Sequence, residues 1–336
     1  MGVTVENPGI LTTVQDRGRY GREQFGMSPA GPMDELSFSV ANLLVGNEAG
    51  ESALECTVLG PTLSFQTETA LAVTGADMSP RLNGQPCPMY QVLLVQPGDT
   101  LQLGAVTAGC RSYIAFAGGI DVPPVMGSRS TALKNQVGGL AGRKLAKGDV
   151  LTLGPSRLPP ASLAGRRAPV PAPQGREVTL RVILGPQDDR FTEEGIQTFL
   201  SQPYTVGKDF DRMGCRLEGP VIAHKTDCNI ISDGMVTGAV QVPGTGQPII
   251  MLAERQTVGG YTKIAAVISA DLPVIGQCKA GDIVRFRAVT LQEAHALCRE
   301  RQAALTALAE GLARPAERRY RVSVSGLTFD IRLSEE

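Results

Sequence analysis

The sequence predicts a mainly β protein with a few helices. It contains 39 glycines, 23 prolines and no tryptophan, so turn residues repeatedly interrupt its apolar stretches. These stretches are too short for most helices, and the glycine, proline or aspartate beside them favours strands at residues 70–76, 90–95, 99–104, 111–119, 180–185, 219–223, 248–253 and 262–269. A proline-rich stretch separates the two groups of strands, which indicates two β-rich domains.

Three segments have helical signals. Residues 32–45 open with a proline and an acidic residue and close at Gly46. Residues 192–200 begin with Thr192 as the expected N-cap. Thr290 and Glu293 have the spacing of a capping box, and six residues then trace one apolar face over about six turns: Leu291, Ala294, Cys298, Leu305, Leu308 and Leu312.

The proline-rich stretch defines the expected domain boundaries. At 336 residues the chain is long for one domain. Residues 155–177 have no useful periodicity and predict a stiff, exposed linker. We therefore expect domains at 1–154 and 178–289, followed by a C-terminal helix and a β-hairpin in 290–336. A Gly-Asp pair before alternating apolar residues, at 98–99, 148–149 and 281–282, suggests a doubled design.

Composition excludes several classes of partner. The formal net charge is -1, so no global field attracts nucleic acid or an anionic membrane. No stretch approaches the roughly 18 apolar residues that span a bilayer, and the N-terminus lacks the pattern of a signal peptide. These features predict a cytoplasmic protein whose partners are small molecules or other proteins. Its seven cysteines, with no C-x-x-C spacing, are expected to be reduced and mostly buried.

Familiar catalytic patterns are scarce. His224 and His295 are the only histidines, and we interpret His295 as a solvated helix residue and His224 as a mainly structural one, so histidine acid-base catalysis has little support. Residues 26–31 lack the glycine spacing of a nucleophile elbow. Residues 138–144 miss the spacing of a P-loop. If ATP is used, other groups must hold its phosphates.

The richest stretch for a binding site runs from Ile231 to Ile264. It places glycines and polar side chains between short apolar runs, so the backbone can approach a ligand closely beside several donors and acceptors. We expect the site in the second domain, with Asp211 and Asp233 as candidate catalytic carboxylates. The candidate substrate-binding residues are Arg212, Ser232, Gln241, Gln256, Thr257, Gly259, Gly260 and Tyr261, with Arg129 as a possible contribution from the first domain.

Several motifs together resemble one family. The motifs are TVQDRGR at 13–19, SPAGPMD at 28–34, GSRST at 127–131, DRMG at 211–214, SDGMVTGAVQVP at 232–243 and AERQTVGGY at 253–261. They resemble the carboxyltransferase-type family known as allophanate hydrolase subunit 2. This family includes the C subunit of the bacterial ATP-dependent 5-oxoprolinase, the antagonist of a sporulation-kinase inhibitor, and the carboxyltransferase part of urea carboxylase. Glu254 and Thr262 depart from the commoner aspartate and proline.

The resemblance carries expectations about fold and activity. It implies two tandem cyclophilin-like β-barrel domains. It implies that this chain is one subunit of 5-oxoprolinase, the enzyme that opens 5-oxoproline to glutamate. We expect the chain alone to be inactive. Its partners would be similar to the B and A subunits of that enzyme, and ATP would be shared with a partner. The alternatives are a carboxyltransferase or allophanate-pathway protein with a separate biotin carrier, and a regulatory binder of a kinase inhibitor.

The C-terminal residues indicate whether this chain can carry covalent biotin. Residues 320–331 predict a hairpin similar to the start of a biotin-carrier module. No lysine stands in a Met-Lys-Met setting. We therefore expect no covalent biotin on this chain.

For a cyclic amide, the candidate residues have complementary chemistry. An arginine can bind a carboxylate through two parallel hydrogen bonds, and the amides of Gln241 and Gln256 can pair with the lactam N–H and C=O. Arg212, Arg129 or Arg255 could supply the arginine. Asp233 or Asp211 could position a nucleophile or accept a proton.

Overall fold

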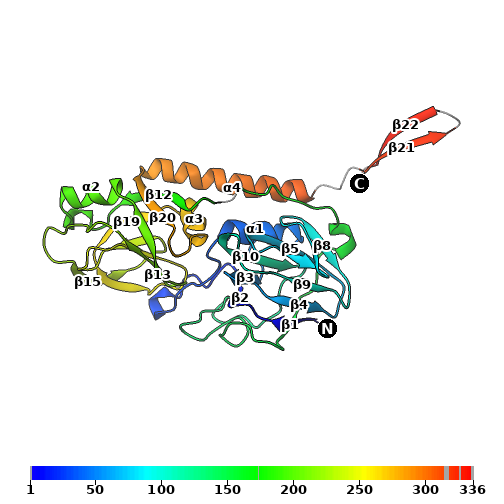
Figure 1. Cartoon of the computed structure of the whole chain (residues 1–336), viewed down its shortest axis with the longest axis horizontal. Helices are drawn as coiled ribbons and strands as arrows, with labels where there is room; N and C mark the ends of the chain where they lie inside the picture. The colour runs from blue at the N-terminus through cyan, green and yellow to red at the C-terminus, as the bar shows by residue number, and fades with distance from the viewer. Residues whose placement is uncertain (1, 173, 314–317, 325–326, 334–336) are drawn as a thin grey trace.

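The protein has two β-rich domains joined along one side by a long helix (Figure 1). The computed structural model describes residues 2–172, 174–313, 318–324 and 327–333. The first domain contains two antiparallel sheets. One has the order β11 (Val150–Thr152), β1 (Gly2–Asn7), β4 (Thr62–Phe65), β9 (Thr100–Gln102), β6 (Arg81–Leu82) and β7 (Gln85–Pro86). The other has the order β2 (Leu11–Gln15), β3 (Ala53–Thr57), β10 (Ala108–Phe116), β5 (Thr69–Asp77) and β8 (Val92–Val95).

The five-stranded sheet is buried on both faces, and alternation along its strands decides which residue faces which side. In β5, Leu71 and Val73 belong to the core between the two sheets. Ala70 and Ala72 instead face the core under helix α1 (Glu35–Leu44). Small alanines on this second face let the helix approach closely, while the bulkier residues fill the space between the sheets.

The second domain is a closed barrel. Its strand order is β12 (Glu177–Leu184), β19 (Lys263–Val267), β16 (Ala239–Gln241), β17 (Ile249–Met251), β14 (Gly214–Glu218), β13 (Tyr204–Phe210) and β20 (Ile283–Ala288). The parallel pairing of β12 with β20 completes the ring, which removes the open edges that a sheet would otherwise present. A separate two-stranded arm projects from it, formed by β15 (Asn229–Gly234) and β18 (Val258–Tyr261). The predicted mainly β fold class is confirmed.

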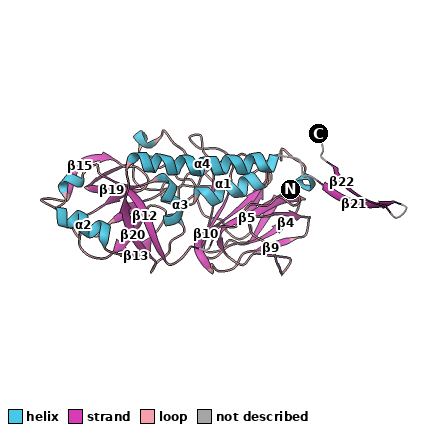
Figure 2. Cartoon of the chain, turned by 90° about the horizontal axis from the view of Figure 1, so that it is seen from above, coloured by secondary structure: helices cyan, strands magenta, loops and turns pink. Residues whose placement is uncertain are grey.

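Helix α4 (Leu291–Ala313) lies across both domains, beside α1 and α3 (Leu272–Gly276) in the view of Figure 2. Its 23 residues give a length of about 35 Å. Ala294 is buried near its start, and Leu305, Leu308 and Leu312 pack on the first-domain core. Leu291 is 58% exposed, so the predicted apolar face is correct except at its first residue. The Thr290–Glu293 capping box forms, with Glu293 N donating to Thr290 Oγ1 at 3.2 Å.

The three Gly-Asp pairs form the same turn. In each, a carboxylate oxygen of the aspartate accepts a hydrogen bond from the backbone N–H three residues earlier: from Gln96 to Asp99, from Ala146 to Asp149 and from Lys279 to Asp282. The glycine N–H donates in turn to a neighbouring strand residue, which is Phe65, Val5 or Val206. The repeated sequence signal therefore marks a repeated structural unit, twice in the first domain and once in the second.

Some local predictions change. Residues 219–223 form no strand, because Ile222 N pairs with the carbonyl of Gly246 in a loop. Helix α1 begins at Glu35, with Asp34 as its N-cap, three residues after the predicted start. Helix α2 (Glu193–Ser201) has the predicted Thr192 cap. The prediction missed α3 and the short 3-10 helices η1 (Glu23–Phe25), η2 (Pro160–Leu163), η3 (Asp188–Arg190) and η4 (Ser269–Asp271).

The proline-rich stretch is not exposed throughout. Leu163 and Ala168 are buried in the first-domain core, and Ala168 N donates to the carbonyl of Tyr90. Leu163 and Ala168 therefore anchor the stretch to the first domain, although most residues around them are exposed. The 1–154 and 178–289 limits stay a prediction.

The C-terminal hairpin forms from β21 (Arg318–Val324) and β22 (Leu327–Leu333). Its turn at 325–326 lies outside the described residues. Within the described part of the chain, no helix is long and apolar enough to cross a membrane.

Candidate active site

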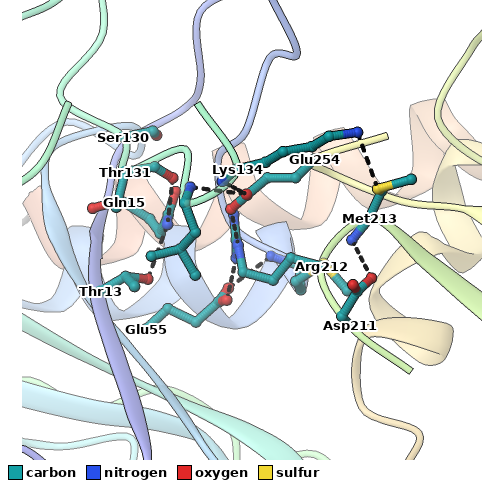
Figure 3. A network of polar contacts seen from close by, with 12 residues as sticks. Thr13, Gln15, Glu55, Ser130, Thr131, Lys134, Asp211, Arg212, Met213 and Glu254 are labelled. Atoms are coloured by element: carbon teal, nitrogen blue, oxygen red, sulfur yellow. Dashed lines mark hydrogen bonds and ion pairs between the residues drawn. The ribbon is translucent and has the colours of Figure 1, made fainter. Parts of the chain in front are cut away.

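The two domains meet through a buried polar network centred on Arg212 (Figure 3). Arg212 is 4% exposed and lies between two glutamates, Glu55 of the first domain and Glu254 of the second. Its Nε donates to Glu254 Oε1 at 2.6 Å, and its Nη2 donates to the carbonyl of Gly31 at 2.6 Å. Its Nη1 pairs with Glu55. Burial alone would lower the pKa of Arg212, but the two glutamates raise that pKa above its ordinary value.

The partners of Arg212 are themselves fully engaged. Glu55 Oε2 accepts from Met33 N and from the hydroxyl of Tyr113, both at 2.8 Å. Glu254 Oε2 accepts from Leu133 N at 2.9 Å, so this departure from the commoner aspartate carries a contact across the domain interface. Because all these groups are enclosed and paired, Arg212 joins the domains. The expectation that it binds substrate is corrected: its guanidinium is turned inward and is occupied by protein oxygens.

Residues 211–214 form a turn, and a cleft opens on the side of this turn away from the Arg212 side chain. Asp211 precedes Arg212 and is exposed, with Oδ1 accepting from Met213 N at 2.7 Å and Gly214 N at 3.0 Å. The cleft has a volume of about 550 Å³ and is lined in part by four predicted site residues: Asp211, Gln241, Gln256 and Tyr261. Residues far apart in the sequence thus meet at one end of the barrel, where β13, β14 and β17 come together.

Two glutamine amides form one wall of the cleft. Gln241 is 2% exposed, and its Nε2 donates to the carbonyl of Tyr261 at 3.3 Å. Gln256 Nε2 donates to Gln241 Oε1 at 3.4 Å. These are long hydrogen bonds, so both amides can exchange them for better ones to a ligand. Gly259 lies behind them, and a Cβ there would lie 2.7 Å from Gln241 Nε2, so a side chain at this position would displace the Gln241 amide.

The remaining predicted residues of the second domain lie on or beside the arm, outside the cleft lining. Ser232, Asp233, Gly259 and Gly260 are in β15 and β18, and Thr257 immediately precedes β18. Asp233 Oδ2 accepts from Lys263 Nζ at 2.6 Å, and this hydrogen bond lowers the pKa of Asp233. Lys263 is 2% exposed. Asp233 is therefore held ionised by a buried cation, and its role as a base stays a prediction.

The two other arginines considered for a substrate carboxylate lie elsewhere. Arg129 Nε donates to the carbonyl of Val122 at 3.0 Å, and its Nη1 is 3.7 Å from Glu51, so its side-chain contacts stay within the first domain. Arg255 is 5% exposed, and its Nε donates to the carbonyl of Met235. Neither residue lines the cleft.

Sequence reasoning missed two cations that do line the cleft, Lys208 and Arg216. Arg216 stands between Cys215 and Leu217, which are 0% and 1% exposed. Alternation along β14 therefore points Arg216 away from the barrel core. That period-two pattern was the signal available in the sequence. Asp209 and Asp211 balance the two cations, so the lining carries no net charge.

Other reactive groups have structural roles. His224 lies over Phe191 with ring centroids 4.6 Å apart, and its Nε2 is 3.1 Å from Thr262 Oγ1. Burial lowers the pKa of His224. The contacts of His224 agree with its predicted structural role. They also give Thr262, the second departure from the family pattern, a hydrogen-bond partner. His295 is exposed, as predicted. Across the described residues, no cluster of three or more histidines, cysteines or carboxylates could hold a metal ion.

A family model described as carboxyltransferase domain, subdomain A and B, matches residues 25–288. The chain belongs to this family. The matched segment begins at the last residue of η1 and ends at the last residue of β20, so it includes the Arg212 network and every residue of the cleft. The resemblance inferred from the motifs is confirmed.

Relatives in the family fall into two groups. The C subunit of 5-oxoprolinase from Escherichia coli (strain K12) is 40% identical over 286 residues, which are 85% of this chain and 91% of that protein. The urea amidolyase of Lachancea kluyveri is 36% identical over 91% of this chain but only 18% of its own length. The crystal structure of the Kluyveromyces lactis urea carboxylase superposes with a TM-score of 0.87 and 32% identity, over 99% of this chain and 32% of that protein. The carboxyltransferase-domain fold thus occurs both in a protein of similar length and inside much longer chains.

Proposed function

We propose that this chain is one cytoplasmic component of an ATP-dependent 5-oxoprolinase and opens 5-oxoproline to L-glutamate with two partners, which are similar to the B and A subunits of that enzyme. We call them the B-like and A-like partners. The observation that carries the proposal is the cleft, which combines two glutamine amides with an exposed arginine. The family membership and the extent of the match to a 5-oxoprolinase component support it.

The cleft suits a small cyclic amide that bears one carboxylate. The amides of Gln241 and Gln256 can each donate and accept, so they can pair with the lactam C=O and N–H. Arg216 can form two parallel hydrogen bonds to the carboxylate, which is the role that the sequence suggested for Arg212, Arg129 or Arg255. Asp211 Oδ1 is used by its own turn, and its second oxygen is available to orient a nucleophile. Preoriented donors of this kind stabilise charge that develops on the amide oxygen.

Coupling to ATP is assigned to the complex. Ring opening of a stable lactam is unfavourable and needs an energy source. The cleft lining contains two cations and two carboxylates, so it has no net charge. Such a neutral lining does not suit a polyphosphate. Residues 138–144 form turns with no following helix, so they offer no phosphate-binding helix N-terminus. We therefore assign the phosphate-binding groups to the B-like partner, and this chain to holding and orienting the amide.

A second candidate is carboxyl transfer with a separate biotin carrier. It is favoured by the match to a urea carboxylase over 99% of this chain. A urea amide would engage the same glutamines, but urea has no carboxylate for Arg216 to bind, whereas allophanate and carboxylated biotin each have one. The identity of the substrate thus separates the two functions.

Reconstitution tests the proposal. The chain is mixed with its B-like and A-like partners, and glutamate release from 5-oxoproline is measured with and without ATP, with urea and allophanate as alternative substrates. We expect glutamate only from the complete, ATP-supplied complex. A complex that consumes urea or allophanate and leaves 5-oxoproline intact would overturn the proposal, as would rapid ATP-dependent turnover by the isolated chain.

A further inference from the structure

A second concave site lies between the domains, separate from the cleft. This interdomain groove has a volume of about 880 Å³ and shares no lining residue with the cleft. Its walls come from the first domain, from residues 170–172 and Gln174, and from α3 of the second domain. Most of the wall residues are apolar, including Pro80, Pro88, Met89, Val170, Pro171 and Val274. Small-molecule sites commonly lie at domain interfaces and have this composition.

The floor of the groove is a fixed polar cluster. Asp34 Oδ2 accepts from Ser37 Oγ and from Gln277 Nε2, both at 2.7 Å. Gln277 Oε1 accepts from the backbone N–H groups of Cys110 and Arg111 at 3.0 and 2.9 Å. Gln277 thereby ties α3 to the first domain. Because these groups satisfy one another, the floor is shaped in advance of any ligand.

Tyr90 is the exception in this floor. It is 4% exposed and has a φ of 56°, a left-handed conformation that is unfavourable for a bulky aromatic residue and often marks a functional position. Its hydroxyl accepts from Gly75 N at 2.9 Å. The hydroxyl proton has one contact among the described residues, to Ser37 Oγ at 3.5 Å, which is too long for a good O–H hydrogen bond. A buried donor at the groove thus lacks a strong acceptor.

We propose that the interdomain groove binds an uncharged, largely apolar small molecule whose hydrogen-bond acceptor receives the Tyr90 hydroxyl proton. The apolar walls bury the body of the ligand, and the hydroxyl fixes its orientation. Since the walls belong to both domains and to the segment between them, the bound molecule bridges the two domains. The site does not depend on the chemistry assigned to the cleft.

Prodan, an uncharged naphthalene fluorophore with one ketone acceptor, is a direct probe of this groove. We expect saturable one-to-one binding with emission shifted to the blue. Tyr90→Phe removes one hydrogen bond and should weaken binding about 2- to 12-fold. Ala172→Arg places a charged side chain in the exposed wall and should weaken binding at least about tenfold.

The control is Val221→Arg, at a position that is 64% exposed and outside the groove, and it should bind prodan like the natural chain. Circular dichroism checks that each variant is folded. The proposal is overturned if prodan emission does not saturate, or if folded Ala172→Arg and Tyr90→Phe both bind prodan with unchanged affinity.

Discussion

Replacing Arg212 with methionine separates a structural role from a substrate-binding one. The change removes a buried cation and leaves Glu254, which is 4% exposed, without its ion pair, and Glu55, which is 1% exposed, with only the 4.0 Å ion pair to Arg111 Nε. Breaking a buried pair from one side costs about 3–5 kcal/mol, because the remaining charges stay desolvated. At about 2–4 °C per kcal/mol for a unit of 150–250 residues, the melting temperature should fall by about 6–20 °C.

The matched control is Arg216→Met. Arg216 is exposed in the cleft, so its loss should change stability by less than about 0.5 kcal/mol while lowering activity of the reconstituted complex. Differential scanning calorimetry and glutamate release are measured on both variants. If Arg212→Met melts like the natural chain but loses activity, Arg212 binds substrate and our assignment of a structural role to it is wrong.

Four further outcomes test the assignments. Gln256→Ala should lower activity about 5- to 150-fold with partner binding intact, whereas the exposed first-domain variant Gln66→Ala should not; full activity would place the site elsewhere. The arm exposes Ile231, Val258 and Tyr261 by 95%, 57% and 42%, and an exposed apolar patch is typical of an interaction surface, so we expect the arm to contact the B-like partner. Ile231→Asp should then prevent co-purification with that partner, while Leu291→Asp on α4 should not; equal recovery of the two complexes would exclude the arm as the contact. Burial lowers the pKa of His224 from 6.5, so the contribution of neutral His224 to stability should be lost as the pH falls below 6.5. The melting temperature of His224→Gln should therefore change less below pH 6.5 than that of the natural chain, and identical pH profiles of the two proteins would contradict this prediction. Limited proteolysis should cut first at 169–176 and spare 155–168, and early cuts inside either domain would argue against this boundary.

Much of the fold was predictable because its signals are local. Seven of the eight predicted strands form, and the caps at Thr192 and Thr290 depend on residues within one turn of each helix. The eighth segment, 219–223, has the composition of a strand, but the glycine and proline at its start and its pairing with Gly246 make it a loop. The proline-rich stretch was misjudged because burial of Leu163 depends on a surface built by distant strands.

The site was predicted less well because its geometry depends on which way each side chain points. Asp211 and Arg212 are neighbours, yet one faces the cleft and the other faces the domain interface. A turn reverses the side-chain direction between them, and composition carries no signal for this. Arg216 could have been found from alternation along its strand. Gln241 and Gln256 were expected from the glycine-rich stretch 231–264, but they come from later strands and turns than Arg216, so no local pattern indicates that the three share one cleft.

The Arg212 network also explains why a small-molecule cleft in one domain requires the other. The turn that presents Asp211 to the cleft is the same turn that sends Arg212 to Glu55. Glu254, which lies just before Gln256 in the sequence, is held by Arg212 and by the first-domain backbone at Leu133. Both edges of the cleft are therefore anchored to the first domain through buried, charge-assisted hydrogen bonds. A displacement of the first domain would move Asp211 and Gln256 together, so the first domain contributes to the cleft by positioning it, without lining it.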